Sequence, residues 1–165
     1  MILSDASLAF HLHTFIPVGA DIGLVNPSSI DIRIGKHMKL EQPDGFVSID
    51  MTEYSQASPL IFPAQGFALV DTYETLAVPN GYVIELKLKS SRAREGWSHL
   101  LAFHFDPGWY GIGTMEIQNV NRWHALPIWY GMRFGQILIH TLDQKAIKPY
   151  TGRYQNATEV QTSKG

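Results

Sequence analysis

Apolar and polar residues alternate with a period of two along much of this chain, and this pattern constrains the fold more than any other feature. It is clearest where Ile84, Leu86 and Leu88 alternate with charged residues. Successive side chains of a β-strand point to opposite faces, so a period of two predicts a strand with one buried face. The pattern recurs over residues 30–34 and 114–118, which indicates a mostly β chain.

Turn-forming residues separate the predicted strands at short intervals. The turn signals are Asn26-Pro27, Pro43-Asp44-Gly45, Pro79-Asn80-Gly81, Asp106-Pro107-Gly108 and Tyr130-Gly131. Many short strands joined by such turns predict a sandwich or a distorted β-barrel. One helix is expected, over residues 6–12, because the side chains of Ser4 and Asp5 can accept hydrogen bonds from the N–H groups of a first helical turn.

The composition limits the possible functions. The 165 residues fit one domain, over residues 1–165, with a looser polar tail after about Tyr150. The chain has no cysteine, which excludes disulfides, thiolate zinc sites and cysteine nucleophiles. The net charge is −2 and Lys and Arg form no run, so no nucleic-acid partner is expected. No membrane span or signal peptide is recognisable, and a cytoplasmic location is therefore expected.

Two segments carry residues suited to binding or moving charge. Residues 89–96 hold two serines and three cations after the best strand, which suits an anion such as a triphosphate. A solvated basic turn is the alternative. Glu116 lies on the polar row of a predicted strand. If this row faces a pocket, burial would raise the pKa of the carboxyl and suit a general acid or base. If it faces solvent, Glu116 has no such role.

Two further groups have weaker patterns. His99, His104 and Asp106 are residue types that bind iron, manganese or zinc, but their spacing is not a tight His-x-His pair, which disfavours a metal site. The polar tail from Tyr150 contains Arg153 and two tyrosines. It is interpreted either as a frayed terminus or as a lid that orders over an anionic ligand.

Taken in order, several segments resemble the dCTP deaminase branch of the dCTP deaminase/dUTPase superfamily. The similarity runs nearly from end to end. The matching segments are Met1-Ile2-Leu3-Ser4-Asp5, Pro27-Ser28-Ser29-Ile30-Asp31-Ile32-Arg33-Ile34-Gly35, Leu69-Val70-Asp71-Thr72-Tyr73-Glu74, Ser90-Ser91-x-Ala93-Arg94-x-Gly96, Asp106-Pro107-Gly108-Trp109-x-Gly111, Thr114-Met115-Glu116-Ile117, Gly131-Met132-Arg133-Phe134-Gly135-Gln136 and Arg153-Tyr154-Gln155.

The resemblance implies a distorted, dUTPase-like β-barrel in a homotrimer, with active sites between subunits and residues 150–165 as a mobile lid. It implies deamination of dCTP to dUTP and ammonia without a metal that activates the water, and Mg²⁺ only as the partner of the triphosphate. Glu116 is the implied proton shuttle, with Arg94 and Ser90 as the other catalytic residues. The implied nucleotide-binding residues are Lys89, Ser91, Asp106, Gln136, Tyr150 and Arg153.

The chain departs from the family pattern at several positions. Leu88-Lys89 replaces Gly-Arg before the two serines, and Arg92 replaces a leucine after them. The family's His-x-Thr-Ala stretch is not recognisable over residues 99–104, and Ala157 stands where a glutamine is usual. These differences leave the substrate open between dCTP, dCMP and a modified cytosine nucleotide.

Three alternatives remain open at the level of sequence. The first is hydrolysis of dUTP to dUMP and pyrophosphate, alone or after deamination. The tail lacks the Gly-rich run of the dUTPase branch, which favours the deaminase branch. The second is a non-catalytic nucleotide-binding β-module. The third is a metal-dependent β-barrel enzyme that uses His99, His104 and Asp106.

Overall fold

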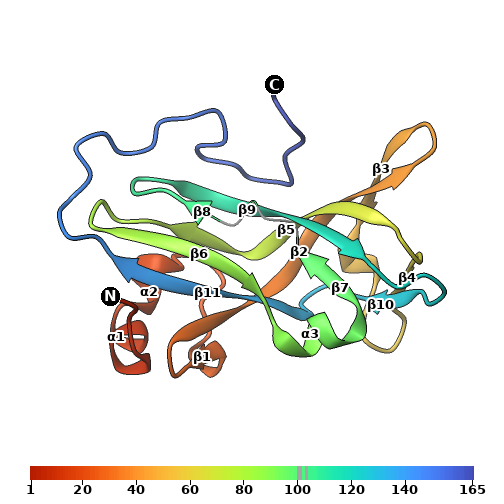
Figure 1. Ribbon diagram of the computed structural model, residues 1–165, viewed down its shortest axis with the longest axis horizontal. Helices are drawn as coiled ribbons and strands as arrows, with labels where there is room; N and C mark the ends of the chain where they lie inside the picture. The colour runs from red at the N-terminus through yellow and green to blue at the C-terminus, as the bar shows by residue number, and fades with distance from the viewer. Residues whose placement is uncertain (100–101, 103) are drawn as a thin grey trace.

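The computed structural model describes residues 1–99, 102 and 104–165 (Figure 1). Strands dominate it, which confirms the prediction of a mostly β chain. The strands are β1 (Val25–Asn26), β2 (Ser29–Gln42), β3 (Gly45–Asp50), β4 (Leu60–Phe62), β5 (Phe67–Ala77), β6 (Tyr82–Leu88), β7 (Trp97–His99), β8 (His104–Phe105), β9 (Tyr110–Asn119), β10 (Leu126–Ile128) and β11 (Arg133–Thr141).

Nine of these strands form one curled sheet in the order β7-β9-β5-β2-β11-β6-β8, with β1 and β3 also paired to β2. The long strand β2 joins the two halves of the sheet. Its first half pairs with β11 and its second half with β5, both antiparallel. The strands β4 and β10 form a separate two-stranded sheet. The sheet therefore curls into a half-barrel around a single core.

The apolar residues of the alternating strands fill the inside of this curl. Ile30, Ile32 and Ile34 of β2 are fully buried, as are Ile84 of β6 and Ile117 of β9. The predicted inner faces of these strands are confirmed. A buried methylene contributes about 0.8 kcal/mol, so this continuous apolar interior is the main source of stability.

Gly35 lies where β2 passes from one half of the sheet to the other. A Cβ atom at this position would lie 2.3 Å from Asp71 Oδ1 and 2.6 Å from the carbonyl oxygen of Thr72. The register between β2 and β5 also shifts between Ile34 and Met38. Only glycine lets the two backbones approach this closely, and the bulge allows the sheet to bend.

The helices differ from the prediction. The expected helix over residues 6–12 is instead two short helices, α1 (Asp5–Phe10) and α2 (Leu12–Phe15), and Ser4 makes no side-chain cap. Residues 90–95, expected to be a turn, form the helix α3 (Ser90–Glu95). Two single-turn 3₁₀ helices, Ile22–Leu24 and Met51–Glu53, complete the described elements. None of the described helices has the length and apolar character needed to cross a membrane.

Candidate functional site

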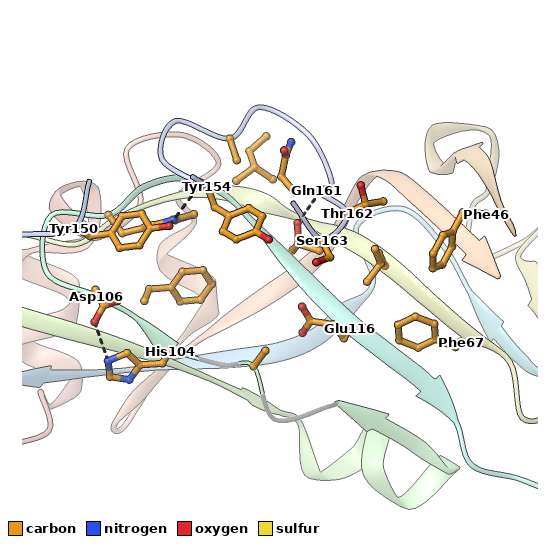
Figure 2. Close-up of a pocket in the computed structure, with 17 residues that line it drawn as sticks. Phe46, Phe67, His104, Asp106, Glu116, Tyr150, Tyr154, Gln161, Thr162 and Ser163 are labelled. Atoms are coloured by element: carbon orange, nitrogen blue, oxygen red, sulfur yellow. Dashed lines mark hydrogen bonds and ion pairs between the residues drawn. The ribbon is translucent and has the colours of Figure 1, made fainter. Parts of the chain in front are cut away.

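A pocket of about 710 Å³ opens between β9, β5 and the C-terminal segment. Glu116 lies in the middle of the lining (Figure 2). Phe46 and Phe67 lie to one side of the carboxylate, and His104 and Asp106 lie to the other. The lining is mostly apolar, with a few polar groups among it, as is typical of small-molecule sites.

The alternation of β9 directs Glu116 into this pocket. Met115 and Ile117 point into the core, so Thr114 and Glu116 point to the opposite face. Leu69 of β5 is the cross-strand partner of Glu116 and lines the pocket beside it. The polar row of this strand therefore faces a pocket, which resolves the choice that the sequence left open.

The Glu116 carboxyl is poorly solvated. Its Oε2 atom is buried and makes no hydrogen bond within the described part of the chain. Burial raises the pKa of Glu116 because the carboxylate loses contact with water. A carboxyl with a raised pKa and an open hydrogen-bonding site is suited to accept a proton and then return it.

Two of the residues implied as nucleotide-binding, Asp106 and Tyr150, line the same pocket. Asp106 Oδ1 lies 3.4 Å from His104 Nε2, and both side chains are more than half exposed. Tyr150 is held because its backbone N–H donates to the carbonyl of Pro107 at 2.7 Å. The structure therefore brings Asp106, Glu116 and Tyr150 together.

The C-terminal segment lies along the start of β9 (Figure 1). The backbone N–H of Ile112 donates to the carbonyl of Ala157 at 2.8 Å, and Gln161 donates from its backbone to Thr114 Oγ1 at 3.0 Å. Gln161, Thr162 and Ser163 line the pocket. Arg153 does not line it, and its guanidinium donates instead to the carbonyls of Lys164 and Gly165.

The other implied residues form a second group at α3, away from the pocket lining. Ser90, Ser91 and Arg94 are exposed to solvent. The Lys89 ammonium contacts Asp31 Oδ1 at 2.5 Å. Gln136 Oε1 accepts a hydrogen bond from Ser29 Oγ at 3.0 Å. The implied residues thus lie in separate places on one chain, with Asp106, Glu116 and Tyr150 at the pocket and Ser90, Ser91 and Arg94 on the α3 surface.

Sequence reasoning missed the aromatic wall beside Glu116. Phe46 comes from β3 and Phe67 from β5, and their ring centroids lie 6.1 Å apart. Phe46 is distant in sequence from every motif, and only the pairing of β3 with β2 brings it here. The register of β5 against β9 could have indicated Phe67 and Leu69, but the sequence does not specify that register.

The metal interpretation gains no support from the described side chains. Among residues 1–99, 102 and 104–165, no group of three or more His, Asp or Glu side chains is arranged to hold a metal ion. His104 and Asp106 form only a pair, and His99 lies on β7 with a pKa lowered by burial. The departure predicted over residues 99–104 includes 100, 101 and 103, which lie outside the described residues.

A family model described as dCTP deaminase-like matches residues 2–142. This chain belongs to the dCTP deaminase-like family. The dCTP deaminase of Pyrococcus horikoshii is 31% identical over 140 residues, which cover 85% of this chain and 84% of that protein. A protein of Acidothermus cellulolyticus named "dCTP deaminase, dUMP-forming" is 34% identical over 167 aligned residues, covering 91% of this chain and 85% of that protein.

Solved structures support the fold. The 2'-deoxycytidine 5'-triphosphate deaminase of Agrobacterium tumefaciens superposes with a TM-score of 0.66 at 19% identity. The match covers 85% of this chain and 47% of that one, so this chain spans about half the length of that protein. A dUTPase of Staphylococcus bacteriophage 80alpha superposes with a TM-score of 0.51 at 15% identity, over 78% of this chain and 85% of that one. The dUTPase-like part of the fold prediction is therefore confirmed.

Proposed function

We propose that this chain deaminates dCTP by hydrolysis, giving dUTP and ammonia, with Glu116 as the group that moves protons. The single observation that carries the proposal is the Glu116 carboxyl, which lies in the pocket with a buried Oε2 atom and a raised pKa. Membership of the dCTP deaminase-like family supports a deamination reaction.

In the proposed reaction, water adds to C4 of the cytosine ring and the amino group leaves as ammonia. Glu116 takes one proton from the attacking water and delivers it to N3, and then takes the second proton from the hydroxyl now on C4 and delivers it to the departing nitrogen. The water oxygen forms the new bond to C4, the bond from C4 to the exocyclic nitrogen breaks, and Glu116 ends ionised as it began. The poorly solvated carboxylate is a stronger base than one in water, which favours the first proton transfer.

The α3 residues are not among those that line the pocket of one chain. Ser90, Ser91 and Arg94 are exposed on α3, while Glu116 lies in the pocket. We therefore propose a homotrimer in which α3 of one subunit faces the pocket of the next. Arg94, Ser90 and Ser91 would then hold the triphosphate and the developing charge. Mg²⁺ would enter with the triphosphate oxygens, since phosphate oxygens are its usual ligands.

The tail would act as a lid in this reaction. Tyr150 and Tyr154 line the pocket, and Gln161 donates to Thr114 two residues from Glu116 on β9. Movement of residues 150–165 would admit the nucleotide, and their return would exclude water from around the reacting carbon. In this arrangement Asp106 contacts the deoxyribose, and Tyr150 and Arg153 contact the phosphates.

A dUMP-forming reaction is the second candidate. The relative from Acidothermus cellulolyticus, 34% identical, carries that description in its name. In this reaction dCTP would give dUMP, ammonia and pyrophosphate, with the same pocket binding the base.

The test is to incubate the purified protein with dCTP and Mg²⁺ and to separate the nucleotides by chromatography. We expect dUTP and ammonia to appear in equal amounts. Appearance of dUMP with pyrophosphate would establish the dUMP-forming reaction instead. If dUTP is cleaved while dCTP is untouched, the chain is a dUTPase. If neither dCTP nor dUTP changes while dCTP still binds, the proposal of an enzyme acting on these nucleotides is wrong and the nucleotide-binding module is favoured.

A further inference from the structure

The buried carboxylate of Asp31 holds two cations that differ in how tightly they are bound. Asp31 lies on the outer face of β2, and its side chain is only 3% exposed. Lys89 Nζ lies 2.5 Å from Oδ1, and Asn26 Nδ2 donates to the same oxygen at 2.9 Å. Arg133 approaches the other oxygen, Oδ2, from the start of β11. One negative charge therefore faces two positive charges.

Lys89 is the cation that Asp31 holds firmly. Its side chain is 24% exposed, and its contact of 2.5 Å is that of a short, charge-assisted hydrogen bond. Arg133 is 58% exposed, and its Nη1 atom lies 3.9 Å from Asp31 Oδ2. This separation is too long for a hydrogen bond, and no residue in the described part of the chain accepts one from the Arg133 guanidinium, so its donors are available to a further acceptor.

The backbone at Arg133 lies near the start of α3. The backbone N–H of Lys89, the residue before Ser90, donates to the carbonyl of Phe134 at 3.0 Å. Arg133 therefore directly precedes Phe134, which is hydrogen-bonded to the residue before α3. The planar guanidinium matches the geometry of a phosphate group and can donate two hydrogen bonds at once, which a lysine ammonium does not do in a fixed geometry.

The local charge also favours an anion. Arg92 is balanced by Glu95 at 2.9 Å, and Asp31 balances one of the three remaining cations, Lys89, Arg94 and Arg133. An excess of two positive charges is left on this surface, although the chain as a whole carries a net charge of −2. A patch of this sign attracts a polyanion and increases its local concentration.

We propose that Arg133 is a phosphate-binding residue of the proposed site and that it selects nucleotides with a triphosphate over those with one phosphate. In this role its guanidinium binds the phosphates together with Ser90 and Ser91, while Asp31 holds Lys89. The inference rests on the proposed function, because it takes the triphosphate of dCTP as the anion that reaches α3.

The test compares Arg133→Gln with Arg133→Lys and with the matched control Arg122→Gln. Arg122 is another arginine, in the loop after β9, where its guanidinium lies over the ring of Trp123 at 5.5 Å. Both glutamine variants remove one positive charge, so they differ only in position. Because the Arg133 side chain is more than half exposed, we expect the variants to fold, and thermal unfolding checks this.

With dCTP and Mg²⁺, we expect Arg133→Gln to raise KM by about tenfold and to leave kcat within about twofold, since one charge-assisted contact contributes roughly 1.5 kcal/mol. Arg133→Lys should recover part of this loss. The inhibition constant of dCMP should change by less than about twofold. Arg122→Gln should behave like the wild type. Equal KM values for Arg133→Gln and the wild type, or an equal rise in Arg122→Gln, would overturn the proposal.

Calorimetry separates this inference from the proposed reaction. If the wild type does not deaminate dCTP, the dissociation constants of dCTP and of inorganic triphosphate are measured for the same variants. A tenfold weaker affinity that is confined to Arg133→Gln would support the phosphate-binding role even though the deaminase proposal had failed. An unchanged affinity for both ligands would reject it. If Arg133→Gln does not fold, the same affinities measured on Arg133→Lys decide between these results.

Discussion

Glu116 and Glu74 are carboxyls of the same curled sheet, the first half-buried and the second fully buried, and burial raises the pKa of each. Their surroundings are opposite. Glu74 is fully buried, and its Oε1 and Oε2 atoms accept hydrogen bonds from Arg33 Nε at 2.7 Å and from the Arg33 backbone N–H at 3.0 Å. Glu116 Oε2 is buried with no hydrogen bond from the described residues, in a pocket that a ligand can enter. Burial alone therefore does not distinguish the two carboxyls, whereas the accessible pocket and the buried oxygen without a described partner do.

Arg33 explains why Glu74 is structural. Its guanidinium also donates to the carbonyl of Gly19 at 2.7 Å and lies over the ring of Tyr73, 4.1 Å from the centroid. One arginine of β2 thus contacts both β5 and the segment before β1. A buried ion pair of this kind is costly to break because the remaining charge has no compensation.

The largest effect is expected from Glu116→Gln. The glutamine keeps the size of the side chain but cannot take or return a proton, so kcat for dCTP should fall by about 10³-fold or more. The dissociation constant of dCTP, measured by calorimetry, should change by less than about threefold. A variant that retains a tenth or more of the wild-type kcat would remove Glu116 from the role of proton shuttle.

Glu74→Gln should lower the stability of the protein and leave kcat unchanged. Removing this charge leaves the guanidinium of Arg33 uncompensated, so the free energy of unfolding should fall by about 3 kcal/mol. Below its melting temperature the folded variant should keep its kcat. Chemical denaturation measures the first quantity and steady-state kinetics the second. A loss of kcat in fully folded protein would show that the contrast between the two carboxyls is wrong.

Substitution of Asp71, another buried carboxyl, should lower stability by less than substitution of Glu74. Its Oδ1 atom accepts from the backbone N–H of His37 at 2.9 Å, and Oδ2 contacts His37 Nδ1 at 2.6 Å. Asp71→Asn can keep only part of this pairing, so we expect a loss of about 2 kcal/mol in the free energy of unfolding, with kcat nearly unchanged. Denaturation curves of the variant and the wild type measure it. If the free energy of unfolding falls as much as in Glu74→Gln, the Arg33–Glu74 ion pair contributes no more to stability than the Asp71–His37 pair.

The smallest effect concerns the dependence of stability on pH. The pKa of Glu116 is higher in the folded chain than in the unfolded chain. Its contribution to stability is therefore complete below the unfolded value of about 4.3 and is lost as the pH rises through the folded pKa. At pH 8 the glutamine of Glu116→Gln avoids the cost of a poorly solvated charge, and we expect this variant to be more stable than the wild type by roughly 1 kcal/mol.

At pH 4 this advantage should disappear, because Glu116 is then protonated in the wild type. Asp71 and Glu74 also have pKa values raised by burial, so the wild type and the variant should both lose some stability as the pH rises. Only the difference between the two curves belongs to Glu116. Denaturation at both pH values measures this difference, and a difference that does not vary with pH would show that the Glu116 pKa is not raised.

The sequence by itself determined the class of the fold. Period-two alternation predicted which faces of β6 and β9 are buried, because a strand places alternate side chains on opposite faces whatever its partners are. The similarity of short motifs in order indicated the family and directed attention to Glu116, Asp106 and Tyr150, which the structure places at one pocket. These properties depend on local sequence, and local sequence was sufficient for them.

How the polar row of β9 is used depends on contacts that no local pattern indicates. The face that carries Glu116 could have met solvent, and the docking of the C-terminal segment together with Phe46 and Phe67 makes it a pocket. The pairing of β3 with β2 and the register of β5 against β9 bring these rings together, and both depend on contacts between residues far apart in sequence. The separate positions of Glu116 and α3, and the pairing of Lys89 with Asp31, likewise follow from the curl of the sheet rather than from any local pattern.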